Sequence, residues 1–141
     1  AGCELFLSQG AASQKGLAMR SSKNAAIGVA VSVTEQRPDL AELVRQCRVF
    51  TFEGPTASSV VTLGPLDVRD LPDGAIATLM HCRTTKPGQT LAWDIALVAG
   101  FHRGVLVSAE YTPGPQGGPF DPRLAAGLVD VYRAQIAGLD R

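Results

Sequence analysis

The sequence predicts an α+β fold, a two-layer sandwich in which an antiparallel sheet carries two helices packed on one face. Three observations lead to this prediction. Residues 38–47 and 121–139 each carry one apolar stripe at helical spacing. Residues 75–111 contain three segments that alternate between apolar and polar side chains, as strands do. Elements with a single apolar face bury those faces against one another, so both helices are expected to cover the Trp93 face of the sheet.

The composition indicates one globular domain, residues 1–141, with a core large enough to be stable without a metal. Thirteen basic residues balance thirteen acidic ones, so the formal net charge is zero. Because phosphate binding needs a basic excess gathered on one face, no nucleic-acid partner is expected. No run of residues approaches the roughly 20 apolar residues of a membrane-spanning helix.

The first expected helix leads directly into a strand. Its apolar side chains fall at i, i+3, i+4 and i+7 on one helical face: Leu40, Leu43, Val44 and Cys47. Pro38 fits the first helical turn, where its missing N–H costs nothing, and Asp39 places an acidic group near the positive helix end. From Val49 to Phe52 the period changes to two, which indicates a strand.

Further strands are expected on both sides of this unit, at residues 16–22, 26–34 and 59–63. The terminal helix begins with Asp121 as its N-cap and Pro122 at its first position. The stripe that this helix turns toward the sheet comprises Leu124, Leu128, Val131, Tyr132, Ile136 and Leu139.

The turn of the last hairpin decides which residues of its two strands lie side by side. A three-residue loop, residues 102–104 with Gly104 left-handed, aligns the apolar rows of both strands, whereas a two-residue turn would not. We therefore expect the three-residue loop. The resulting pairs, all facing the helices, are Val107 with Ala99 and Ala109 with Leu97.

The preceding turn, at residues 86–89, sets the register of the other hairpin. It places Cys82 opposite Trp93 and Met80 opposite Ile95. Cys82 is then expected in the core, as a small apolar side chain.

The same register brings His81 opposite Asp94 on the outer face of the sheet, with Glu110 one strand further. His81, Asp94 and Glu110 therefore form a candidate polar cluster. A histidine–carboxylate pair near a hydroxyl, such as that of Ser108, is the skeleton of a hydrolytic site. An exposed cross-strand ion pair accounts for the same residues without catalysis, and this interpretation is preferred.

Three cysteines, Cys3, Cys47 and Cys82, leave two interpretations open. The chain holds either three thiols in a reducing compartment, or one disulfide and one thiol in an oxidising compartment. A Cys47–Cys82 bond is geometrically open, because both side chains face the layer between helix and sheet. No CxxC pair is present and the two histidines lie far apart in the sequence, so neither a zinc site nor another cofactor is expected.

The chain contains, in order, CELFL near its start, a Val-rich strand, DLAELVRQC leading into RVFTF, a meander and a final amphipathic helix. This order resembles a family of small exported lipoproteins of unknown function from mycobacteria and related actinobacteria. More distantly, it resembles the extracellular sensor domains of mycobacterial receptor-type Ser/Thr kinases.

The resemblance implies an extracytoplasmic protein, in the cell envelope or secreted, that meets the membrane only through a lipid anchor upstream of the domain. It also implies a disulfide between Cys3 and Cys47. Ala1-Gly2-Cys3 resembles the end of a lipobox, but an acylated cysteine is normally followed by a polar tether. Because apolar residues follow Cys3 here, the disulfide is preferred to acylation. No catalytic residues come with the family.

The expected function is non-catalytic binding of an apolar small molecule or an envelope protein, or action as a sensor module. The lack of a catalytic set supports it, as do small outer-face residues that leave room for a groove: Ala77, Ala92 and Ala96. The alternative is a small hydrolase that uses the His81–Asp94 pair. The sequence leaves the ligand and the oligomeric state open.

Overall fold

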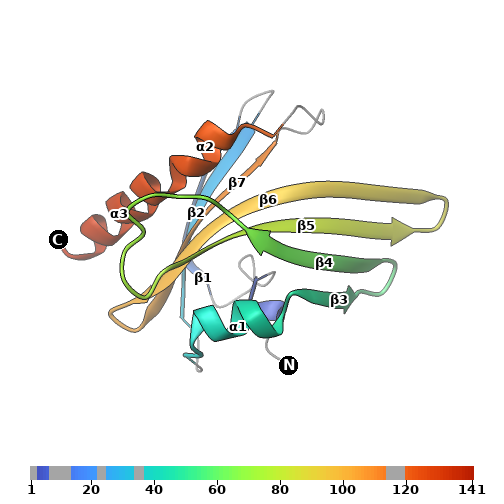
Figure 1. The fold of residues 1–141 in the computed structure, drawn as a ribbon, viewed down its shortest axis with the longest axis horizontal. Coiled ribbons are helices and arrows are strands. Elements are labelled where there is room, and N and C mark those ends of the chain that lie inside the picture. Colours follow the sequence, from blue (N-terminus) through green and yellow to red (C-terminus); the bar gives the residue numbers. More distant parts are fainter. Residues whose placement is uncertain (1–2, 7–13, 22–24, 34–36, 114–119) are drawn as a thin grey trace.

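The structure is a computed structural model that describes residues 3–6, 14–21, 25–33, 37–113 and 120–141. These residues form an antiparallel sheet with helices, which confirms the α+β class (Figure 1). The helices are η1 (Cys3–Phe6), α1 (Leu40–Gln46), α2 (Pro122–Ala126) and α3 (Leu128–Leu139). The strands are β1 (Gln14–Ser21), β2 (Ala25–Ser32), β3 (Val49–Glu53), β4 (Ser58–Pro65), β5 (Ile76–Lys86), β6 (Gln89–His102) and β7 (Val105–Pro113).

The described strands form one seven-stranded sheet in the order β1-β2-β7-β6-β5-β4-β3. Every neighbouring pair is antiparallel. The expected strands at residues 16–22, 26–34 and 59–63 are present as β1, β2 and β4, each with ends shifted by one or two residues. At the ends of the sheet, β1 and β3 each have a neighbouring strand on one side only.

The helices pack on opposite faces of the sheet, so the prediction that they share one face is wrong. Along β6, Leu97 and Ala99 belong to the core under α1, whereas Ala96 and Val98 belong to the core under α3. Figure 1 shows α1 below the sheet and α3 above it. The reason is that both rows of β6 are apolar, and successive side chains of a strand point to opposite faces. Of the small residues predicted on an outer face, Ala77 and Ala96 lie in the core under α3, whereas Ala92 is exposed.

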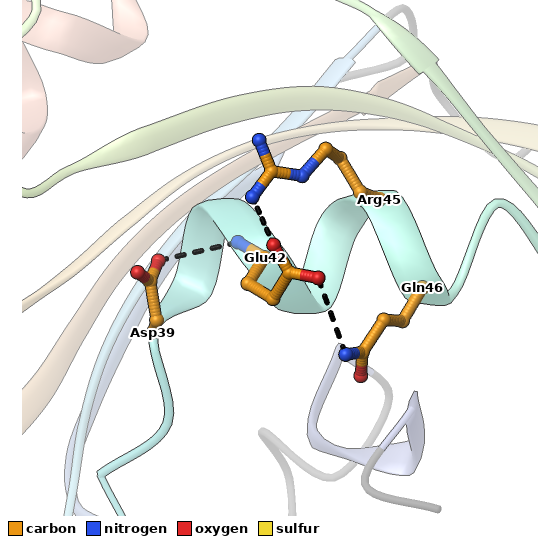
Figure 2. A network of polar contacts seen from close by, with 4 residues as sticks. All are labelled: Asp39, Glu42, Arg45 and Gln46. Carbon is orange, nitrogen blue, oxygen red and sulfur yellow. Dashed lines mark hydrogen bonds and ion pairs between the residues drawn. The ribbon is translucent and has the colours of Figure 1, made fainter.

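Hydrogen bonds of two acidic side chains, Asp39 and Glu42, stabilise the short helix α1. Asp39 Oδ1 accepts a hydrogen bond of 3.2 Å from the backbone N–H of Glu42, as expected of an N-cap. The Glu42 carboxylate accepts hydrogen bonds from the side chains of Arg45 and Gln46, one helical turn further along (Figure 2). Leu40 and Leu43 are buried against the sheet, on the predicted stripe.

The register of the β5–β6 hairpin is as predicted. Cys82 pairs with Trp93 and His81 with Asp94. Gly88, in the two-residue turn that joins Lys86 to Gln89, has a φ of 76°.

The register of the β6–β7 hairpin differs by one residue from the prediction. Arg103 and Gly104 form a two-residue turn with φ values of 51° and 83°, the pattern of a type I′ turn. Gly104 is left-handed as expected, but Ala109 pairs with Val98 and Val107 with Gly100. The prediction assumed that only one face of the sheet is covered. Because α3 covers the second face, the apolar row of β7 can lie there.

The terminal helix is also interrupted, at Gly127, and so forms α2 and α3. Asp121 caps α2 by accepting a hydrogen bond of 2.9 Å from the N–H of Arg123, and Pro122 occupies the first turn, as predicted. The N–H of Asp121 donates to the Tyr111 hydroxyl at 3.0 Å, which fastens the start of α2 to β7.

The other end of the terminal helix is fixed by polar contacts. Asp140 Oδ1 lies 2.8 Å from His102 Nε2 and 2.9 Å from Arg103 Nε, so the β6–β7 turn holds the C-terminal end of α3. The hydrogen bond from His102, assisted by the charge of Arg103, lowers the pKa of Asp140. No helix among the described residues is both long and apolar enough to span a membrane.

Candidate functional site

Cys3 and Cys47 form a disulfide, with their Cα atoms 5.6 Å apart, which confirms the pairing expected from the resemblance. The bond joins η1 to the end of α1. Phe6 is buried in the same core as Cys47, so the described N-terminal turn packs as part of the domain. A Cys47–Cys82 bond, left open by the sequence, is excluded.

Cys82 is a free, buried cysteine. Burial raises the pKa of the Cys82 thiol to about 11, and the nearby charges of Asp94 and Glu110 add to this effect. The thiol is therefore protonated at neutral pH, which makes it a poor nucleophile. Cys82 acts as a small core side chain, as expected.

His81 and Asp94 form the expected contact. Asp94 Oδ1 lies 2.5 Å from His81 Nδ1, and the side chains are 35% and 55% exposed. On the next strand Thr62 pairs with His81, so its hydroxyl is carried on the same face. Thr62 was not predicted as part of this cluster, because no signal in the sequence indicates that β4 pairs with β5.

Glu110 does not belong to this cluster, and the prediction that it does is wrong. It pairs with Leu97, whereas Asp94 shares the opposite face with Ala96 and Val98. The one-residue change of register at the β6–β7 turn moves Glu110 and Ser108 to the α1 side of the sheet. A site that combines Ser108 with His81 and Asp94 is therefore not formed. Burial raises the pKa of Glu110.

A cleft of about 800 Å³ lies between residues 67–70 and the helices α2 and α3. Its charged lining residues comprise three aspartates and three arginines: Asp67, Arg69, Asp70, Arg123, Asp130 and Arg133. One of them also shapes the cleft, because Arg133 Nη2 donates a hydrogen bond to the backbone carbonyl of Asp70. This lining suits a small polar ligand with charges of both signs better than an apolar one. No local pattern in the sequence predicts the cleft.

Exposed apolar side chains gather on the part of the sheet that extends beyond the helices, which we call the arm (residues 49–62 and 81–94; Figure 1). Among the described residues, the arm holds five of the seven large apolar side chains that are exposed: Val49, Phe52, Val60, Leu91 and Trp93. The strand register places Phe52, Leu91 and Trp93 on the α1 side. Such a concentration of exposed apolar surface is typical of an interaction site.

In the part of the chain that the structure describes, no three His, Cys, Asp or Glu side chains gather as metal ligands would. Comparison with models of known protein families finds no match, and comparison with curated proteins and with solved structures finds none either. The resemblance to envelope lipoproteins thus stays a prediction from the order of segments. The arm, the cleft and the His81–Asp94 pair remain as candidate sites, to be judged on their chemistry.

Proposed function

We propose that the chain is a non-catalytic binding domain of the cell envelope that engages a protein partner or an apolar ligand through the arm. The observation that carries this proposal is the exposure of five large apolar side chains on the arm, three on the α1 side and two on the other side. Trp93 and Phe52 are of the aromatic types that supply much of the binding energy at protein interfaces.

The proposed location rests on the Cys3–Cys47 disulfide, since such bonds persist in oxidising compartments and are rare in the cytosol. The resemblance to exported lipoproteins supports the same location, with an acyl chain upstream of the domain as the tether to the membrane. A sensor role would use the arm in the same way, as the surface that recognises another envelope component.

The proposal is tested by photo-crosslinking in an actinobacterial host, with a photoreactive residue in place of Leu91 on the arm. The matched control is Leu139 at the end of α3, because these leucines are 38% and 36% exposed. We expect adducts to a protein or a lipid from position 91 and none from position 139. Equal labelling at both positions, or labelling only at position 139, would contradict the proposal.

Trp93 offers an independent measurement, because it is the only tryptophan in the chain and is 39% exposed. Binding at the arm should shift its fluorescence emission to shorter wavelength as the indole leaves water. The identified partner, or vesicles of the crosslinked lipid, should give this shift with the parent protein. Replacing Leu91 with serine should weaken binding at least about tenfold, since a central apolar contact is lost.

A small hydrolase is the second candidate, favoured by the contact between His81 Nδ1 and Asp94 Oδ1 beside the Thr62 hydroxyl. This arrangement has the chemical order of a hydroxyl, an imidazole and a carboxylate. Hydrolysis of p-nitrophenyl butyrate by the parent protein, lost in the His81→Ala and Thr62→Val variants, would support it. Rates equal to those in buffer would exclude it for this class of ester.

A further inference from the structure

Within the part of the chain that the structure describes, the outer edge of β3 presents unpaired backbone N–H and C=O groups at known positions. On its inner side, Arg48 O accepts from Leu63 N and Gly54 N donates to Ala57 O, both at 2.8 Å. In an antiparallel pair, every second residue directs its N–H and C=O to the neighbour. Because Arg48 and Gly54 both bond toward β4, the backbone groups of Phe50 and Phe52, at the even positions between them, also bond to β4. The N–H and C=O groups of Val49, Thr51 and Glu53 point away from the sheet.

This edge lacks most of the features that keep edge strands from pairing. Within the described residues β3 is the last strand of its sheet, and it has neither a lysine nor a proline. Val49 is 64% exposed and Phe52 is 46% exposed, so the edge is also apolar. The zero net charge of the chain leaves little long-range repulsion between two copies.

We propose that β3 pairs antiparallel with β3 of a second copy, about a two-fold axis at Thr51. This register sets Thr51 opposite the partner's Thr51, and Val49 opposite the partner's Glu53. All the outward-pointing backbone groups then find partners, in about six hydrogen bonds between the chains. Moving the register by one residue would oppose outward-pointing and inward-pointing groups, and moving it by two would leave some of these groups unpaired.

The side chains favour the same arrangement. Phe50 lies opposite the partner's Phe52, so that four phenylalanine rings form one row on the α1 side. Arg48 precedes the strand and Glu53 ends it, on opposite faces of the sheet, so antiparallel pairing brings the basic end of each strand alongside the acidic end of its partner. A parallel arrangement would bring like charges together. This charge complementarity of the edge with itself selects a second copy as the occupant.

The dimer forms through the outer edge of β3, whereas the proposed binding function is tested at Leu91 and Trp93, although Val49 and Phe52 belong to both surfaces. The two are tested by different residues. Loss of crosslinking at Leu91 would leave the dimer in place, and loss of the dimer would leave the crosslinking in place.

The test is the oligomeric state of the full chain, measured by sedimentation equilibrium with its disulfide intact. We expect a reversible dimer. Thr51→Lys and Thr51→Glu should each weaken it at least about tenfold, because each sets two like charges directly opposite one another. An equimolar mixture of the two variants should dimerise again, since lysine then faces glutamate. Thr51 is exposed, so neither change disturbs the core.

Val49→Lys is the matched control, because it adds the same charge two residues away from the two-fold axis. It should retain or strengthen the dimer, since the new lysine meets the partner's Glu53. A parent protein that stays monomeric up to about 1 mM, the weak end of measurable association, would overturn the inference. A dimer that tolerates Thr51→Lys would overturn it too, as would a mixture of charge variants that does not reassociate.

Discussion

At the scale of single residues, one glycine determines how closely α3 approaches the sheet. A Cβ placed on Gly100 would lie 2.3 Å from the Tyr132 hydroxyl oxygen and 3.2 Å from Ala75 Cα. Tyr132 is itself buried in the α3-side core, and burial raises the pKa of its hydroxyl. The tyrosine thus occupies space that only a glycine leaves free.

Gly100→Ala is therefore expected to lower the free energy of unfolding by about 1–3 kcal/mol, the usual cost of overpacking. Urea unfolding followed by circular dichroism measures it. The control is Gly138→Ala in α3, where a Cβ meets no atom within 4 Å. That change should raise stability by up to about 1 kcal/mol through helix propensity. Equal stability of the Gly100→Ala variant and the parent would contradict this packing.

The partly buried carboxyl group of Glu110 makes the stability of the fold depend on pH. Burial raises its pKa above the ordinary value of 4.5, so the folded chain holds this proton more tightly than the unfolded chain does. The contribution of Glu110 to stability is then fully present below pH 4.5 and is lost as the pH rises through the folded-state pKa.

Glu110→Gln, which stays neutral, should therefore be more stable than the parent at pH 7. The advantage should shrink as the pH falls toward 4.5. Thermal unfolding of both proteins between pH 4 and pH 8 tests this prediction. A stability advantage of the Glu110→Gln variant that grew as the pH fell would contradict a raised pKa of Glu110 in the folded chain.

At the scale of elements, the disulfide fastens η1 and the end of α1 over one face of the sheet. The two cysteines are 44 residues apart in the sequence. Closing a loop of this length restricts the unfolded chain and stabilises the fold by about 4 kcal/mol in the chain-entropy model. The side chains of Phe6, Leu40 and Leu43 complete the same core, so their packing depends on this bond.

Replacing Cys3 and Cys47 together by serine should therefore lower the free energy of unfolding by about 2–4 kcal/mol. Chemical unfolding measures the loss. Non-reducing peptide mapping of the parent should join the two cysteine peptides, and Cys82 should react with alkylating agents only after unfolding. Cys82→Ala serves as the control because it keeps the bond. A double variant as stable as the parent would show that the link adds nothing.

Local signals in the sequence predicted most of the elements but not all of their relations. The apolar stripe of α1 and the Lys86–Gln89 turn are each decided within a few residues, and each was predicted correctly. Asp39 was predicted near the start of α1, but Pro38 was placed in the first turn, whereas it precedes the Asp39 N-cap. The β6–β7 register was not, because an arginine with positive φ carries no turn signal comparable to Asn-Gly. The break at Gly127 was missed because the apolar stripe continues across it.

At the scale of the whole molecule, the sequence did not reveal that the sheet is covered on both faces. Ala77, Ala92 and Ala96 were read as an outer row because their side chains are small, yet Ala77 and Ala96 belong to the core under α3, and only Ala92 is exposed. The cleft was missed for a related reason. Residues 67–70 and α2–α3 are more than 50 positions apart in the sequence, and no periodic pattern records that they meet.

The two cores also differ in how they are held, because only the α1 side contains a covalent link. The α3 side depends on apolar packing and on polar contacts such as that of Asp140 with His102. A reductant should therefore act on one face of the same sheet. In amide hydrogen exchange we expect η1 and α1 to lose protection first, while the amides of α3 exchange at their former rate.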